Sequence, residues 1–232
     1  EDGEGHGSIV CSNSNLTIAT GAVVSVESAR PGAVVGPGGF WAGNRISVDG
    51  RVEATLARGG SRMTGVNGLI SATGVRVSAT GAVVVSGQDV ARGAAIQGGD
   101  DGAIIDGVVE CSAYTSSDAG GCVAGGDFAS VGDTGSITAH NAACFGSGCV
   151  LEVGKGAKEG WEFRGTIEAE HVWTFSAGGV VSGDSFAMAG NASIAAKNVT
   201  ARGSGSVVAV ENLTLRDGAR LSATGQWGGD GG

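Results

Sequence analysis

Five cysteines and four asparagine sequons are the residues of this 232-residue sequence whose types and spacing suggest covalent chemistry. Four of the cysteines form two close pairs, in the segments CSAYTSSDAGGC and CFGSGC. Thiols at such spacing can cross-link loops in an oxidising compartment. We therefore predict two disulfides, Cys111–Cys122 and Cys144–Cys149. Cys11 is left over, and we expect it to be a small buried residue, or the partner of a cysteine outside this chain, rather than a nucleophile.

Zinc binding by the paired cysteines is the weaker alternative. The sequence has no C-x-x-C spacing and places no histidine beside either pair, whereas zinc sites commonly combine these features. We therefore predict no metal site, and no cofactor.

The sequons are N-x-S/T triplets, which in secreted proteins accept N-linked glycans. Half of the eight asparagines of the chain lie in them. The predicted glycosylation sites are Asn15, Asn191, Asn198 and Asn212.

Carboxylates that could serve catalysis or calcium binding occur in the segment GGDDGAIID, which contains Asp100, Asp101 and Asp106. Asp101 stands where the calcium-binding pattern G-G-x-G-x-D requires its third glycine, so calcium binding is only weakly indicated. A polysaccharide lyase would also need a base and cations to hold an acidic substrate. The nearest cations, Arg92 and Lys155, belong to no motif that would supply them.

Other candidate catalytic or sugar-binding residues are isolated from one another. No histidine adjoins a serine or cysteine motif, so we predict no catalytic residue and do not expect an enzyme. Tryptophan side chains could form stacking platforms for carbohydrate, although only Trp173 occupies an outward position of a repeat. The residues concerned are His6, His140, His171, Trp41, Trp161, Trp173 and Trp227.

Charge and composition exclude two classes of partner. The net charge is −9 and the fourteen Lys and Arg residues are scattered, which argues against nucleic acid because phosphate binding requires clustered cations. No apolar stretch is long enough to span a bilayer, so membrane insertion is not expected. The chain combines 46 glycines with 41% hydrophobic residues, and it is therefore expected to be ordered rather than a flexible linker.

A repeated pattern along the chain predicts the elements that position these residues. Each copy reads apolar-x-apolar, then a glycine and a small residue, then apolar-x-apolar again, as in NLTIATGAVVSV from Asn15 and NLTLRDGARLSA from Asn212. Alternation of period two indicates short strands with one buried face, and the glycine indicates a turn in which φ can be positive. Consecutive copies begin at Val172, Phe186, Val199 and Leu213, and further copies begin at Leu16 and Val75. A tighter variant appears in ISVDGRVEA and WEFRGTIEA.

These units resemble the coils of right-handed parallel β-helix proteins, a group that includes pectin-lyase-like enzymes and the stalks of surface adhesins. The resemblance implies an all-β fold, with residues 1–232 forming a single β-solenoid. Irregular, loop-rich insertions are expected at about 88–160, where the repeat is lost. A β-sandwich with irregular hairpins is the second choice, because hairpins seldom keep a phase of 13 to 14 residues.

The repeat offers a second interpretation of three sequons. Asn15, Asn198 and Asn212 each precede the first apolar residue of a unit, where β-helices commonly stack turn asparagines into a hydrogen-bonded ladder. A ladder predicts buried amides, whereas glycosylation predicts exposed ones. His171 and Ser185 occupy the same slot in other units and interrupt the ladder, so glycosylation is favoured.

The sequence therefore favours a secreted, N-glycosylated structural or adhesive module, extracellular or on a cell or virion surface, that assembles end to end into a fibre. Its expected partners are further copies, through the solenoid ends, or other surface proteins, with carbohydrate as a further candidate. A solenoid's ends expose unpaired strand edges, which must be capped or paired. The alternative is a pectin-lyase-like polysaccharide lyase or hydrolase, because stacked coils can assemble a catalytic cluster that no linear motif reveals.

Overall fold

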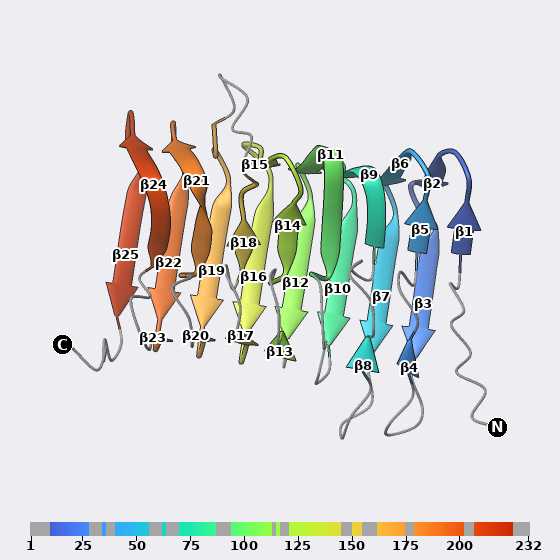
Figure 1. Ribbon diagram of the computed structural model, residues 1–232, viewed down its shortest axis with the longest axis horizontal. Coiled ribbons are helices and arrows are strands. Elements are labelled where there is room, and N and C mark those ends of the chain that lie inside the picture. The colour runs from blue at the N-terminus through green and yellow to red at the C-terminus, as the bar shows by residue number, and fades with distance from the viewer. Residues whose placement is uncertain are drawn as a thin grey trace.

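The structure is a computed structural model. It describes residues 10–27, 34–35, 40–55, 62–63, 70–86, 94–112, 115–116, 121–144, 150–154, 162–174, 179–201 and 207–224. Within these ranges the regular secondary structure consists of β-strands, and the strand pairs are all parallel. The strands stack side by side into one elongated β-solenoid (Figure 1), which confirms the predicted fold class.

Two large sheets form most of the wall. The eleven-stranded sheet contains β1 (Val10–Ser12), β2 (Leu16–Ile18), β5 (Phe40–Ala42), β6 (Arg45–Val48), β9 (Ile70–Val77), β11 (Ile96–Ile105), β14 (Val123–Gly125), β15 (Ala129–Val131), β18 (Leu151–Glu152), β21 (Val181–Met188) and β24 (Val208–Leu215). The eight-stranded sheet contains β3 (Val23–Glu27), β7 (Arg51–Thr55), β10 (Ala82–Ser86), β12 (Val108–Ser112), β16 (Ser136–His140), β19 (Thr166–Glu170), β22 (Ser193–Lys197) and β25 (Arg220–Thr224).

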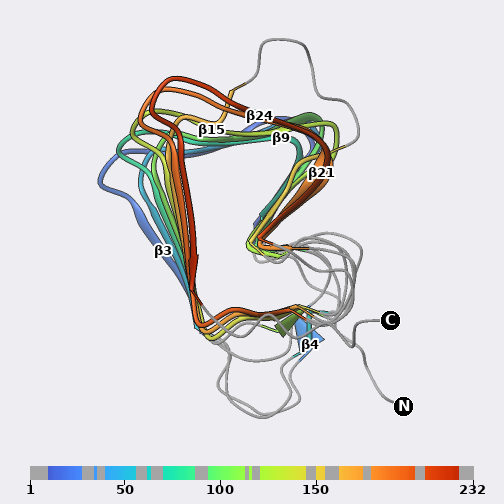
Figure 2. The ribbon, with the colours of Figure 1, turned by 90° about the vertical axis from the view of Figure 1, so that its left-hand side faces the viewer.

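After a strand of the eight-stranded sheet, the chain continues into one of two smaller sheets. The four-stranded sheet contains β13 (Thr115–Ser116), β17 (Ala143–Cys144), β20 (Trp173–Thr174) and β23 (Thr200–Ala201), and the two-stranded sheet contains β4 (Val34–Val35) and β8 (Arg62–Met63). Figure 2 looks along the stack and shows successive turns superposed around one interior. We call one such turn a rung, and residues in register in successive rungs a column.

Parallel register places equivalent residues of successive rungs next to each other. Neighbouring strands of the eight-stranded sheet pair residues between 26 positions apart (Ala82 with Val108) and 31 positions apart (Arg51 with Ala82). Because side chains alternate between the two faces of a strand, every second residue points into the core. One inward column is completely aliphatic, and its members between the end rungs are at most 1% exposed: Val52, Val83, Val109, Ile137, Ile167 and Ile194.

The register also settles the size of the sequence unit. Phe186 pairs with Leu213, and Trp173 pairs with Thr200, so units that begin at 186 and 213 lie in one wall and those at 172 and 199 in another. Each unit of 13 to 14 residues is therefore half a rung.

The corner that leads into the eight-stranded sheet has a long and a short form. The long form is a four-residue turn closed by a backbone hydrogen bond, as from the amide of Gly81 to the carbonyl of Ser78. In the short form, two successive amides, those of Asp106 and Gly107, donate to the carbonyl of Val77 in the preceding rung. The tighter sequence variants are short corners, and a third, AIIDGVVEC at 103–111, lies within the range in which the sequence repeat was lost.

Glycine has two different functions at these corners. Gly21, Gly190 and Gly218 have φ values of 80°, 64° and 82°, so the predicted left-handed turn is present there. At Gly107 and Gly165 the requirement is close packing, because an added Cβ would overlap the carbonyl oxygen of Gly81 or Gly135 in the preceding rung. The glycine column therefore lets neighbouring corners approach each other.

The rungs continue through the range 88–160, where we expected insertions. Its described residues include β11 to β18, and each of these strands pairs with a strand of a neighbouring rung. β11 contains an irregularity between Gly98 and Gly102 that shifts its register against β9, and this interrupts the sequence phase. Residues 87–93, 113–114, 117–120, 145–149 and 155–161 lie outside the described residues.

Candidate functional site

The last described rung, formed by β24 and β25, lies at one end of the stack of strands (Figure 1). Leu213, Leu215 and Leu221 are 43%, 50% and 41% exposed. Their column neighbours one rung earlier are buried, at 5% for Phe186, 0% for Met188 and 1% for Ile194. The leucines therefore occupy core columns, and within the described residues they are packed by a neighbouring rung on one side only. Covering these half-exposed side chains would contribute about 3 kcal/mol in total.

The edges of the same rung provide a second element of recognition. β24 pairs with β21, and β25 pairs with β22, each on one side only within the described residues. The other edge of each strand presents backbone N–H and C=O groups that can pair with a further parallel strand. We refer to this surface, the two edges together with the three leucines, as the C-terminal face.

The opposite end of the described solenoid has the same columns. Leu16 and Val24 are half-buried against the core, and Ile18 and Val26 are buried, at 5% and 8% exposure. β2 and β3 pair with β6 and β7 on one side only within the described residues. We call this surface the N-terminal face, and it exposes less apolar surface than the C-terminal face.

Cys111 and Cys122 are in contact, as the sequence spacing suggested. Both are free thiols in the structure and are completely buried. Cys111 points inward from β12, and Cys122 directly precedes β14 of the next rung, so a disulfide would join two rungs across the core. The Cys111–Cys122 disulfide remains a prediction. Cys149 and the side chains of Cys11 and Cys144 lie outside the described residues.

Burial raises the pKa of the Cys111 thiol well above its ordinary value, and the contact with Cys122 raises it further. The folded state therefore keeps the proton at pH values where the unfolded chain has lost it. The consequence is a stability contribution that is present below the ordinary thiol pKa of about 8.5 and is lost as the pH rises beyond it.

For the reduced protein we expect the free energy of unfolding to fall by up to about 1.4 kcal/mol per pH unit above pH 8.5 because of this thiol. Urea unfolding at pH 7.5, 8.5 and 9.5 measures the effect. Cys111→Ala is the matched control, since alanine occupies the same column at Ala139, and it should lose this part of the pH dependence. Oxidation to the Cys111–Cys122 disulfide should also remove it. Equal pH profiles for the reduced protein and Cys111→Ala would contradict the assignment.

All four sequon asparagines are exposed, and they do not form one ladder. Asn15 and Asn212 occupy equivalent positions at the start of β2 and in β24, and the amide of Asn212 lies 3.5 Å from the hydroxyl oxygen of Ser185 in the preceding rung. Asn198 lies at another corner, where it and its column neighbour His171 have φ values of 52° and 55°. Asn198 shares the sequence phase of Asn15 and Asn212 but lies in a different column, because that phase recurs twice in each rung.

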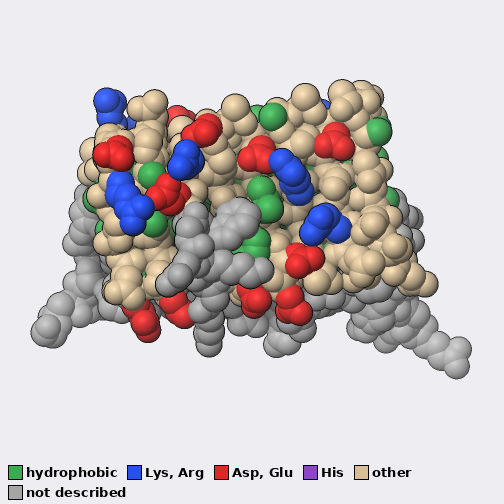
Figure 3. Space-filling view, turned by 90° about the horizontal axis from the view of Figure 1, so that it is seen from above, with side chains coloured by type: hydrophobic (Ala, Val, Ile, Leu, Met, Phe, Trp, Pro, Cys, Tyr) green, Lys and Arg blue, Asp and Glu red, His purple; other side chains and the backbone are tan. Residues whose placement is uncertain are grey.

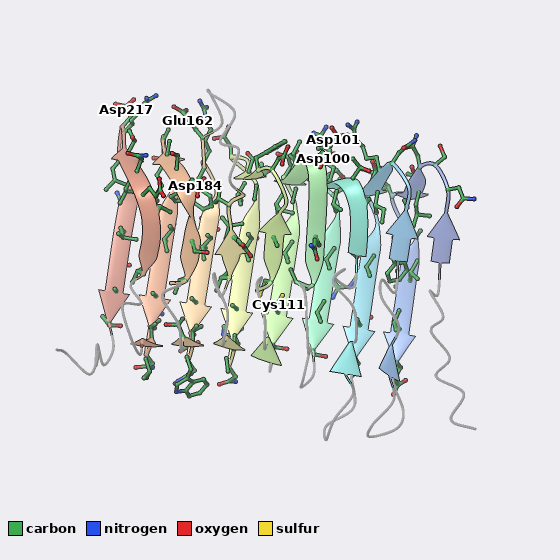
Figure 4. All side chains as sticks on the ribbon, in the orientation of Figure 1. Asp100, Asp101, Cys111, Glu162, Asp184 and Asp217 are labelled. Atoms are coloured by element: carbon green, nitrogen blue, oxygen red, sulfur yellow. The ribbon has the colours of Figure 1, made fainter. Side chains whose placement is uncertain are left out.

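Two of the three carboxylates of the GGDDGAIID segment lie beside arginines of other rungs. Asp106 lies 2.9 Å from Arg76, and Asp101 lies 3.5 Å from Arg45. Arg45 and Asp101 come from the rungs on either side of Gly74, and their side chains meet across it. Because Gly74 has no side chain, nothing at this position separates them. Figure 4 shows Asp100 and Asp101 at one edge of the solenoid, away from the interior position of Cys111.

A similar long-range ion pair lies further along the solenoid. Glu162 contacts Arg164 at 3.0 Å and Arg216 at 2.7 Å, and Arg216 comes from the last described rung. Figure 3 views this charged face from above and shows acidic and basic side chains interspersed over it. Each of these ion pairs is at least partly exposed, so they contribute little to stability. Asp101 and Asp106 each lie beside an arginine. Neither carboxylate is therefore favoured as a catalytic base.

A shallow hollow on the eight-stranded sheet contains one of the histidines. His140 Nδ1 lies 3.5 Å from Glu170 Oε2, and Glu168 and Lys197 complete the polar lining of this hollow of about 60 Å³. Small-molecule sites typically enclose about 300 to 1,000 Å³, so the hollow is suited to a few waters rather than to a substrate. Trp173 is 38% exposed on β20 and does not line it.

Several other predicted residues lie outside the described part of the chain, namely His6, Arg92, Lys155, Trp161, Trp227 and the side chain of Trp41. Among the described residues, no three His, Cys, Asp or Glu side chains come together in a group that could hold a metal ion. The described residues also contain no helix long and apolar enough to cross a membrane.

Comparison with known proteins adds no family. No family profile matches the chain, and no curated protein or solved structure is significantly similar to it. A functional proposal therefore has to come from the geometry of the chain itself.

Proposed function

We propose that this protein is a secreted, N-glycosylated structural or adhesive module that forms part of a rod and makes its principal contact through an end face. The exposed leucines of the C-terminal face carry this proposal. In a stable protein, large apolar side chains at core positions are normally covered, and exposed apolar patches commonly mark interaction surfaces. We therefore infer that a partner covers the C-terminal face and packs against the three leucines, as a neighbouring rung would.

The sequons support the secreted and glycosylated part of the proposal. All four asparagines are exposed and accessible to a glycan, whereas a buried ladder would have argued against attachment. Intact mass of the protein from its native source, before and after N-glycosidase treatment, tests this part. An unchanged mass would contradict it.

The alternative of a polysaccharide lyase or hydrolase is less well supported. It would need carboxylates and a base that act together on neighbouring rungs, and both Asp101 and Asp106 are engaged by arginines. Incubation with a panel of acidic and neutral polysaccharides, with and without calcium, distinguishes the two functions. Cleavage that is lost in Asp101→Ala or Asp106→Ala would favour the enzyme.

Sedimentation velocity at increasing protein concentration tests the contact through the end face. We expect the average mass to increase with concentration, and to increase more strongly at high salt, because screening reduces repulsion between chains of net charge −9 while apolar contacts persist. A single monomeric species at all concentrations, together with no binding of the C-terminal face to any surface protein, would overturn the proposal.

A further inference from the structure

We propose that the exposed indole ring of Trp173 is a binding platform for the first N-acetylglucosamine of the glycan on Asn198. The inference rests on the proposed function, because it requires that Asn198 is glycosylated, and it specifies where that glycan binds. The ring and the glycosylated asparagine belong to neighbouring rungs. The first sugar therefore lies against the wall of the solenoid instead of extending freely into solvent.

The register around one corner of the solenoid places the two residues close together. Before the corner Glu170 pairs with Lys197 in the eight-stranded sheet, and after it Trp173 pairs with Thr200 in the four-stranded sheet. The two rungs have the same number of residues between these pairs, so the columns remain aligned through the corner. Asn198 precedes, by two positions, the residue that pairs with Trp173.

The separation of these positions is within the reach of an attached sugar. Adjacent strands are about 4.8 Å apart and a strand rises about 3.3 Å per residue, so positions one strand and two residues apart are at most about 8 Å from each other. The sugar is attached to the end of the asparagine side chain, and the indole ring also extends away from its backbone. The two can therefore meet without a change in the backbone.

Asn198 and Trp173 point to the same, outer side of the wall. Asn198 is exposed and Trp173 is 38% exposed, whereas Val172 and Val199 point into the core and are completely buried. Because side chains alternate between the two faces of a strand, Thr200 also lies on the outer side. Asparagine, sequon threonine and tryptophan therefore share one surface.

The neighbours of Trp173 in its own column leave room for a sugar. They are Ala143 in the preceding rung and Thr200 in the following one, and both side chains are smaller than indole. An aromatic face attracts the positively polarised C–H groups on one side of a sugar ring, and the indole N–H can donate a hydrogen bond to a sugar oxygen. This surface therefore has the chemistry that N-acetylglucosamine requires.

The corner adds a polar side chain beside the attachment point. His171 is the column neighbour of Asn198, and the two residues have φ values of 55° and 52°. His171 is exposed, and its imidazole can exchange hydrogen bonds with the hydroxyl or acetamido groups of the sugar. His171 and Trp173 thus flank the first sugar from the preceding rung.

The sequon at Asn212 provides an internal control. Asn212 pairs with Ser185, and Ala187 lies two positions further along the same strand. Neither residue is aromatic, so the strand beside Asn212 has no ring in the place that Trp173 occupies relative to Asn198. The two glycans should therefore behave differently in one molecule.

NMR of the protein secreted by a glycosylating host cell, with isotopically labelled sugars, tests the contact. Protons that lie over an aromatic face resonate upfield, so we expect upfield shifts for the first sugar on Asn198 relative to that on Asn212, and nuclear Overhauser contacts with the indole. Both should disappear in Trp173→Ala, which should fold because alanine occupies this column at Ala143. Trp173→Phe keeps a smaller ring and should retain part of the shift.

Hydrogen exchange measures whether the contact stabilises the corner. The amide of Thr200 donates to the carbonyl of Val172 at 2.8 Å, which joins the two rungs. A sugar that binds both rungs should slow exchange of this amide about three- to ten-fold. An endoglycosidase that leaves the first sugar should preserve this protection. Asn198→Asp, which removes the glycan and tolerates positive φ, should abolish it, whereas Asn212→Asp should not.

Site-resolved mass spectrometry of the same samples separates the inference from the proposed function. An unoccupied Asn198 would overturn the inference, while glycans at other sequons would leave the proposed function standing. An occupied Asn198 whose sugar resonances and amide protection do not respond to Trp173→Ala would also overturn the inference alone. Protein from the native source that carries no glycan would overturn the glycosylated part of the proposed function as well.

Discussion

The double variant Leu215→Asp/Leu221→Asp is expected to weaken end-to-end association by at least about 100-fold. Each leucine is about half exposed and would lose about 1 kcal/mol of apolar burial at the contact through the C-terminal face. Each aspartate would in addition place a carboxylate without a partner in a dry interface, which costs more than the lost burial. Together these effects exceed about 3 kcal/mol, and 1.4 kcal/mol corresponds to a factor of ten.

Sedimentation velocity measures this effect, with Val108→Asp as the matched control. Val108 is an exposed aliphatic residue of β12 in the middle of the stack, at 36% exposure, and it points away from the core. The control adds one carboxylate to the outer surface and should associate like the unmodified protein. Equal association of the leucine variant and the unmodified protein would show that the C-terminal face is not the contact.

The largest expected effect on stability is that of Gly107→Val. A Cβ at this position would overlap the carbonyl oxygens of Gly81 and Ser78 in the preceding rung, and these are backbone atoms that cannot rotate away. The corners of the two rungs would have to separate, and the hydrogen bond from the Val108 amide to the Gly81 carbonyl, now 3.0 Å, would stretch. We expect a loss of about 3 kcal/mol, the upper end of the usual cost of overpacking.

Urea unfolding combined with limited proteolysis measures this loss. Val108→Thr, at the next residue, is the control, because it keeps the shape of an exposed side chain and should change stability by less than about 0.5 kcal/mol. Repeat proteins can unfold in segments, so proteolysis also reports whether cleavage begins near the substituted corner. An unchanged midpoint for Gly107→Val would mean that the corners are free to move apart.

Local alternation was sufficient to predict which residues point inward. Ile18, Val24 and Val26 were assigned to the core from their period of two, and the structure places them in the same columns as Leu215, Leu221 and Ala223. The short corners were also visible, as the tighter variant of the repeat. These features depend only on backbone geometry over a few residues, which a linear pattern records.

The register between rungs could not be obtained in this way. The unit repeats twice in each rung, so equal phase along the chain does not imply one column, and Asn198 was grouped with Asn15 and Asn212 for this reason. The irregularity of β11 between Gly98 and Gly102 likewise concealed regular rungs within 88–160. Which strands become neighbours depends on the length of each corner and loop. A change of a few residues in one loop is enough to shift the sequence repeat out of phase.

The ion pairs between rungs were visible only in the tertiary structure. The pair of Arg45 with Asp101 joins residues 56 positions apart, and no local pattern connects them. The proximity of Cys111 and Cys122 was anticipated from spacing, but their burial across the core from each other was not.

By itself, the sequence of this protein determined a stack of short strands with an aliphatic interior, because period-two alternation and small residues at corners are local requirements. It also contained the two similar segments from Asn15 and Asn212, which are identical at six of twelve positions. Only the tertiary structure showed that these segments form the first and last described rungs, and that Leu213 and Leu221 are exposed where their column neighbours are buried. Burial of a solenoid residue depends on whether another rung lies above it, and this is a property of the stack rather than of the residue.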